Sequence, residues 1–228
     1  MIARGLIASA VAVAAMVAIA LWTNGMLPDG DRIPVHYGLD GEPDRWGDRG
    51  EAMFALWFMI GITAFTALVL AAAPALTPRK ENINVSERSY LMLWITVLVL
   101  MVGVTASISA SMLGHDDIST RLMIGGMGAL FAVIGNYLPK TRSNWVIGVR
   151  TPWTLSSETS WNATHRVTGR LYMISGALTV AAALFAPKSW LLTILLVSLI
   201  GSSLVGVVYS YFVWRGADDK IGEPDLIE

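Results

Sequence analysis

Residues Leu191–Trp214 read LLTILLVSLIGSSLVGVVYSYFVW, an apolar stretch without a charged residue. An α-helix rises about 1.5 Å per residue, so about 20 apolar residues cross the hydrocarbon core of a bilayer. This stretch is therefore long enough to span a membrane as one helix, and it decides the fold class.

The composition of the whole chain agrees with that of a membrane protein. Hydrophobic residues make up 54% of its 228 residues and charged residues only 14%, whereas about 25% of a typical soluble domain is charged. This deficit excludes a disordered chain, a nucleic-acid-binding module and most cytosolic enzymes. The chain has no cysteine, which excludes disulfides, thiolate zinc sites and iron–sulfur clusters. We expect no cofactor and no metal.

Five further stretches have the same character, although the first and fourth are short. We therefore expect an all-α integral membrane protein with six transmembrane helices, one long outer loop and one long inner loop. A cleaved signal peptide is the alternative for the first stretch, because Arg4 precedes it and Ala18-Ile19-Ala20 resembles a cleavage site; we expect a retained helix. The other spans are predicted at Leu6–Trp22, Ala52–Ala73, Leu91–Leu113, Leu122–Leu138 and Val167–Ala186.

The distribution of basic residues predicts the orientation. Cytoplasmic loops of membrane proteins carry an excess of lysine and arginine. With both termini in the cytoplasm, eleven of the 16 basic residues lie inside and five outside, so we expect cytoplasmic termini. The inner set is Arg4, Arg79, Lys80, Arg88, Lys140, Arg142, Arg150, Arg166, Arg170, Arg215 and Lys220.

The middle of each predicted span lacks ionisable residues, which argues against a proton-coupled pump. Small residues recur every four positions in the last span (Ser198, Ser202, Gly206 and Ser210) and in the third (Gly103, Ser107 and Ser111). Such residues allow close helix packing. We expect packing within the bundle; a homo-oligomer face is the alternative.

The outer loop, about Gly25–Gly50, is predicted to be a structured, acidic and aromatic surface, because Gly41 and Pro43 favour turns. His36 is interpreted as a hydrogen-bonded structural residue, with a ligand or proton-sensitive role as the alternative. Alternating carboxylates also mimic an EF-hand calcium loop, but Arg45 replaces the required glycine and Pro43 interrupts it. We expect a solvated acidic loop.

The inner loop, about Pro139–Arg166, is basic and rich in tryptophan. Its Ser156-Ser157-Glu158 run is typical of a helix start, after which Trp161 is expected to anchor at the membrane interface. The functional interpretation is a basic aromatic docking patch for a protein or anionic lipid, made by Arg150, Trp153, Trp161, His165 and Arg166. The structural alternative is a re-entrant loop held by tryptophan anchors and arginine–lipid contacts.

The two loops carry a family resemblance. The inner loop reads Ile147-Gly148-Val149-Arg150-Thr151-Pro152-Trp153-Thr154-Leu155, followed by Trp161, His165 and Gly169. This motif resembles the signature of the SdpI family, membrane immunity proteins against a sporulation-delaying toxin. The outer stretch Ile33–Trp46, with Pro-x-His and Gly-x-Pro-Asp-x-Trp elements, resembles a small domain of unknown function often found at the front of such proteins.

The resemblance implies a bacterial plasma-membrane protein that protects a cell against a secreted, membrane-acting toxin. It also implies signalling, in which the protein holds a small transcriptional repressor at the membrane without binding nucleic acid itself. We expect a two-helix unit over residues 1–75, with the outer motif at 25–50, and an SdpI-like four-helix unit over 76–228, with the inner motif at 139–170.

The sites follow from the two motifs. We place partner binding on the inner loop at Asn144, Gly148, Arg150, Thr151, Pro152, Trp153, Thr154, Trp161, His165 and Arg166. We place toxin recognition on the outer loop at Pro34, His36, Gly41, Pro43, Asp44 and Trp46.

Two other functions stay open at this point. The runner-up is a small transporter or channel whose loops act as gates. A membrane-interface hydrolase using Glu158 and His165 for acid–base chemistry is a third, although no nucleophile, metal set or phosphate loop accompanies this pair. We therefore expect a protein that is not an enzyme.

Overall fold

The computed structural model describes residues 1–27, 32–38, 43–77 and 86–220. Its described part contains six helices that are long and apolar enough to cross a membrane, so the predicted six-span architecture is confirmed and the chain is a multi-pass membrane protein. The helices extend the predicted spans at most ends: α1 (Ile2–Met26), α2 (Arg49–Leu76), α4 (Glu87–Met112), α5 (Asp116–Tyr137), α7 (Glu158–Phe185) and α8 (Lys188–Arg215).

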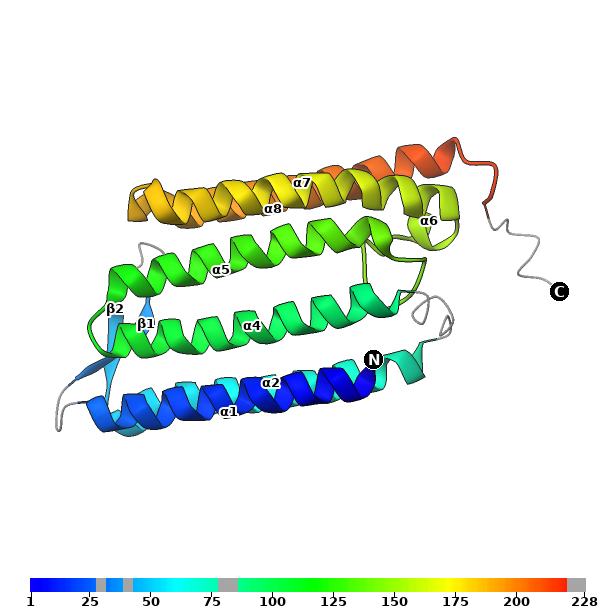
Figure 1. Cartoon of the computed structure of the whole chain (residues 1–228). Helices are drawn as coiled ribbons and strands as arrows, with labels where there is room; N and C mark the ends of the chain where they lie inside the picture. Colours follow the sequence, from blue (N-terminus) through cyan, green and yellow to red (C-terminus); the bar gives the residue numbers. More distant parts are fainter. Residues whose placement is uncertain (28–31, 39–42, 78–85, 221–228) are drawn as a thin grey trace.

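The long helices run side by side in a slab (Figure 1). Helices α1 and α2 form one face, α7 and α8 the opposite face, and α4 and α5 lie between them. Helix α4 packs on α1, and α5 packs on α7. The middle pair therefore connects the two outer pairs, mainly through α1 and α7.

Glycines bring the backbones of α5 and α7 into direct contact. A Cβ on Gly135 would lie 2.5 Å from the Gly169 carbonyl oxygen, and one on Gly176 would lie 2.5 Å from that of Gly128. Only residues without a side chain permit this approach, which increases van der Waals contact between membrane helices. The spacing of small residues in the sequence did not predict this glycine interface.

The small residues of the last span pack within the bundle, as predicted. Ser202 Oγ lies 2.7 Å from Ser175 Oγ of α7, and Gly206 faces Thr168, whose Oγ1 would be 2.4 Å from an added Cβ. In the third span, Ser107 Oγ donates to the Ser119 carbonyl of α5 at 2.5 Å, whereas a Cβ on Gly103 would meet no atom within 4 Å.

The described part of the predicted outer loop is a β-hairpin. A structured loop with turns was predicted there, but no strands. Strand β1 (Ile33–Tyr37) pairs antiparallel with β2 (Pro43–Gly47), and the register shifts on both sides of His36. Ile33 is buried in a cluster with Ala52, Leu56 and other apolar residues of the neighbouring helices. The hairpin is thus attached to the bundle through one edge, and we call this end of the molecule the hairpin end.

Residues 138–157 lie at the opposite end, which we call the loop end (Figure 1). They include a 3₁₀ turn, η1 (Leu138–Lys140), and the short helix α6 (Pro152–Leu155). Helix α7 then begins at Glu158, and its N-cap Ser157 accepts a hydrogen bond from the Ser160 amide at 3.0 Å. The predicted helix start at Ser156-Ser157-Glu158 is therefore confirmed. Met1 and the end of α8 also lie at the loop end.

Candidate sites at the two ends of the bundle

The hairpin presents polar side chains on its exposed face. His36 Nδ1 lies 2.6 Å from Asp44 Oδ1, and both side chains are exposed. Arg45 forms an ion pair with Glu51 at 2.7 Å, and Trp46 is 46% exposed. The cross-strand contact of His36 agrees with its interpretation as a hydrogen-bonded structural residue.

The other predicted recognition residues of the hairpin are less exposed or lie outside the described residues. Pro34 and Pro43 are half-buried, while Gly41 lies outside the described residues. Among the described residues, no group of three or more histidines or carboxylates could hold a metal ion. Two carboxylates of the EF-hand-like run, Asp40 and Glu42, also lie outside the described residues.

A polar cluster fastens the hairpin to the helices beneath it. The hydroxyl of Tyr37 donates to Asp116 Oδ1 at 2.8 Å, and Ser111 Oγ donates to the same oxygen at 2.8 Å. Ser111 Oγ also contacts the Tyr37 hydroxyl. Since Ser111 lies in the last turn of α4 and Asp116 begins α5, the cluster joins β1 to the turn between the two central helices.

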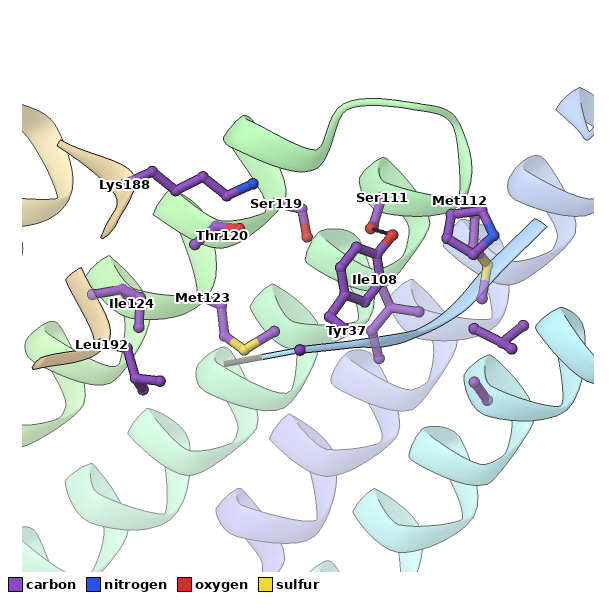
Figure 2. A pocket seen from close by; sticks show the side chains of 14 residues that line it. Tyr37, Ile108, Ser111, Met112, Ser119, Thr120, Met123, Ile124, Lys188 and Leu192 are labelled. Carbon is purple, nitrogen blue, oxygen red and sulfur yellow. Dashed lines mark hydrogen bonds between the residues drawn. The ribbon is translucent and has the colours of Figure 1, made fainter. Parts of the chain in front are cut away.

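A cavity of about 390 Å³ lies beneath the hairpin, next to this cluster. Figure 2 shows Lys188 extending from the start of α8 on the far side of the cavity from Tyr37 and Ser111. Cavities of this size hold small ligands or single side chains. Its wall is mainly apolar and comes from β1, α2, α4, α5 and α8: Pro34, Val35, Tyr37, Gly38, Ala55, Ile108, Ser111, Met112, Ser119, Thr120, Met123, Ile124, Lys188 and Leu192.

At the loop end, Asn144 organises the chain after η1. Its side-chain oxygen accepts hydrogen bonds from the amides of Val146 and Ile147, each at 2.7 Å, and its amide nitrogen donates to the Arg142 carbonyl at 2.7 Å. Asn144 is 1% exposed. An asparagine whose oxygen accepts from backbone amides just ahead fixes a turn, so this side chain is structural.

Thr151 and Thr154 organise the next part of the loop. They form a capping box around α6, in which the Thr151 hydroxyl accepts from the Thr154 amide at 3.2 Å and the Thr154 hydroxyl accepts from the Thr151 amide at 3.0 Å. Pro152 occupies the first turn of α6, where a missing N–H costs nothing. Thr151 also contacts Ser210 of α8 at 3.1 Å, which ties the loop to the bundle.

Trp161 and His165 form the buried centre of the loop end. Their rings stack with centroids 3.9 Å apart, and Trp161 Nε1 donates to the Thr141 carbonyl at 3.0 Å. His165 Nε2 accepts from the Val149 amide at 3.1 Å. The proton is therefore on Nδ1, which donates to the Trp161 carbonyl at 2.7 Å. The neutral imidazole thus holds residues 138–157, which we call the motif loop, to α7.

Gly148 is required by this arrangement. Its φ is +124°, and a Cβ at this position would lie 2.3 Å from His165 Nε2. The conformation favours glycine, and no other residue leaves room for the histidine. Gly148 is thus a structural residue of the loop.

The structure corrects the predicted docking patch. Trp161 is 0% exposed and His165 is 1% exposed, so these rings cannot contact a partner, and Trp161 does not anchor at the membrane interface as predicted. The same holds for the buried Asn144, Thr151 and Thr154, whose polar groups are used within the loop. The exposed or half-exposed predicted residues are Gly148, Arg150, Pro152, Trp153 and Arg166.

The structure also shows the surroundings of Glu158 and His165, the pair considered for acid–base chemistry. Glu158 is exposed at the first turn of α7, whereas both ring nitrogens of His165 already have backbone partners. His165 has no nitrogen available for proton transfer in this arrangement.

A contact that the sequence analysis missed comes from the chain after α8. The Asp219 carboxylate accepts hydrogen bonds from the Ser157 hydroxyl at 2.6 Å and from the Thr159 amide at 2.8 Å. These two hydrogen bonds lower the pKa of Asp219 below its usual value of 3.8. Asp219 therefore caps α7 together with Ser157, a pairing across some 60 residues that local patterns do not reveal.

Comparison with known proteins finds a family match for each of two parts of the chain. Residues 140–210 match the SdpI/YfhL protein family, and residues 11–64 match DUF1648, a domain of unknown function. No curated protein and no solved structure matches the chain. The first match contains α6, α7 and the buried loop centre, and the second contains the hairpin. The chain therefore contains one region that is similar to the SdpI/YfhL family and, before it, one that is similar to DUF1648.

Proposed function

We propose that this chain is a receptor-like immunity protein of a bacterial plasma membrane, protecting the cell against a secreted, membrane-acting toxin. The SdpI/YfhL match supports this class of function. The excess of basic residues at the loop end supports cytoplasmic termini, with the hairpin outside.

The observation that carries the proposal is the cavity beneath the hairpin. Its volume of about 390 Å³ and its mainly apolar wall suit an apolar side chain or acyl group of a membrane-active molecule. The exposed hairpin residues His36, Asp44 and Trp46 lie on the strands above it. A toxin would thus meet the hairpin first and place an apolar group beneath it.

The central helices offer a route from this cavity to the cytoplasmic end. The Tyr37–Ser111–Asp116 cluster lies where α4 and α5 meet. At the other end, Ser86, which precedes α4, accepts a hydrogen bond from the Arg142 amide at 3.1 Å, and α5 continues through η1 into the same loop. A displaced Tyr37 would therefore act on two helices that both contact the motif loop.

The cytoplasmic partner we propose is a small repressor that contacts the exposed side chains of the loop end. Arg150, Pro152 and Arg166 are exposed, and the half-buried Trp153 lies against Tyr211 with ring centroids 5.2 Å apart. Aromatic and arginine side chains are typical anchors of protein interfaces. The buried members of the motif hold these side chains in place.

The test is survival of a toxin-sensitive bacterium that expresses this chain and is challenged with purified sporulation-delaying-type toxin. Ala55→Phe fills the cavity from α2, and Ala64→Phe places the same ring on the exposed face of that helix. We expect protection by the wild type and by Ala64→Phe, and loss of protection by Ala55→Phe at equal membrane levels.

Two results would contradict the proposal. A well-expressed wild-type chain that gives no protection would refute immunity against this toxin. Full protection by Ala55→Phe would show that the toxin does not use the cavity. Substrate uptake or current in proteoliposomes would instead favour a transporter or channel.

A further inference from the structure

A second hollow lies at the loop end, between the last turns of α2 and the motif loop. It has a volume of about 600 Å³. Its wall consists of Val69, Ala72, Ala73 and Leu76 of α2, Thr77, and Trp145, Val146 and Arg150 of the loop. The DUF1648 match ends at residue 64 and the SdpI/YfhL match begins at residue 140, so the α2 residues of the groove lie outside both.

The α2 side of this groove is apolar and open. Leu76 is 80% exposed and Val69 is 48% exposed, and both lie on a membrane-spanning helix. Exposed apolar side chains on a membrane-spanning helix face the lipid chains of the bilayer. The wall along α2 therefore suits an acyl chain.

The loop side of the groove has the character of a membrane interface. Trp145 is 50% exposed, and tryptophan rings concentrate where the hydrocarbon core meets the headgroups. Val146 and Ile147 next to it pack against the buried cluster around Tyr90 and Trp94. The backbone that carries Trp145 is thus held by a packed segment of the loop.

Arg150 supplies the charge of the groove. It is the sole ionisable residue among the described residues that line it, and its side chain is exposed. One guanidinium nitrogen donates to the Trp145 carbonyl, which holds the charge beside the tryptophan. A guanidinium carries five N–H donors and matches the geometry of a phosphate.

From this juxtaposition we infer that the groove is a binding site for one anionic phospholipid of the leaflet at the loop end. An acyl chain lies along Val69, Ala73 and Leu76, and the headgroup phosphate lies against Arg150 beside Trp145. Basic pockets at the cytoplasmic side of membrane helices bind anionic headgroups. The lipid would connect the last turns of α2 to the loop that begins the SdpI/YfhL match.

The test measures quenching of tryptophan fluorescence in the purified full chain by brominated phosphatidylglycerol and brominated phosphatidylcholine. The Trp145→Phe variant identifies the part of the quenching that belongs to this site. We expect half-maximal quenching of that part at an about fivefold lower fraction of phosphatidylglycerol than of phosphatidylcholine, the factor that corresponds to one basic side chain at an anionic surface.

Arg150→Gln should abolish this preference, and Arg150→Lys should retain most of it. Arg142→Gln is the matched control and should keep the preference, because the Arg142 side chain is exposed on the same loop but does not line the groove. Ala73→Leu, which narrows the groove and keeps Arg150, should weaken quenching by both lipids.

The inference is overturned if the wild type is quenched equally by both lipids, or if Arg150→Gln retains the preference. A folding defect is recognised separately, because it would shift the melting temperature of the variant in detergent. The readout requires neither toxin nor repressor, so it stands apart from the immunity proposal.

Discussion

The hairpin and the motif loop lie at opposite ends of the same helices, and they use their motif residues in opposite ways. At the hairpin, His36, Asp44 and Trp46 are exposed, and Tyr37 links the strands to α4 and α5. At the loop end, Asn144, Trp161 and His165 are buried and hydrogen-bonded to backbone groups. A sequence motif therefore marks a surface at one end and an internal framework at the other.

The largest effect is expected when alanine variants of the two histidines are compared. His165→Ala removes a stacked ring and leaves the Val149 amide without its partner, and we expect a loss of about 3 kcal/mol in the free energy of unfolding. His36→Ala removes an exposed pair and should cost less than about 1 kcal/mol. Unfolding of both variants in the same detergent checks this, and equal losses would contradict the division into surface and framework.

A smaller effect is expected where the hairpin joins the bundle. Tyr37→Phe removes the hydroxyl that bonds to Asp116 and contacts Ser111, and should cost about 1 kcal/mol. Because the contact holds one strand, amide hydrogen exchange should accelerate over residues 33–37 and 43–47 and not in the motif loop. Tyr209→Phe, on the half-buried face of α8, is the control. Unchanged exchange in the hairpin would show that Tyr37 does not fasten it.

The smallest effect concerns the Asp219 cap and depends on pH. The hydrogen bonds from Ser157 and Thr159 lower the pKa of Asp219 in the folded chain. The ionised carboxylate therefore stabilises the fold above the unfolded-state pKa, and this stabilisation is lost as the pH falls through the folded-state pKa. Because the carboxylate is exposed, we expect at most about 1 kcal/mol.

Asp219→Asn should abolish this acid-dependent part of the stability, whereas Asp218→Asn, one residue earlier on the exposed chain, should leave it unchanged. Melting temperatures measured between neutral pH and the acidic range compare the two. The same acid dependence in both variants would mean that Asp219 is not the titrating cap.

The sequence predicted those elements whose formation depends on a single local property, such as the length of an apolar stretch or a helix-capping residue. Apolar length alone located six helices, and Ser157 marked the start of α7. The hairpin was missed because its strands are short and its proline and aspartate residues favour turns. The burial of Trp161 was missed because a tryptophan near a helix end reads as an interfacial anchor until the Thr141 carbonyl and the His165 ring are found beside it.

The candidate sites were predictable to a lesser degree. The two sequence motifs predicted candidate sites at the hairpin end and at the loop end. They did not distinguish Arg150, which is exposed, from His165, which is buried. The cavity beneath the hairpin has walls from five elements, and the groove at the loop end joins residues some 75 positions apart in the sequence. Such concave surfaces follow from tertiary packing, which local patterns do not encode.

The glycine contacts between α5 and α7 have a mechanical consequence. Two helices whose backbones touch at Gly135 and Gly176 cannot slide or rotate past each other without a steric clash. They are therefore expected to move as one rigid unit. Helix α4 meets α5 more loosely, with a hollow of about 530 Å³ between them around Gly103 and Gly126. A relative movement of α4 and α5 therefore meets fewer backbone contacts than a relative movement of α5 and α7.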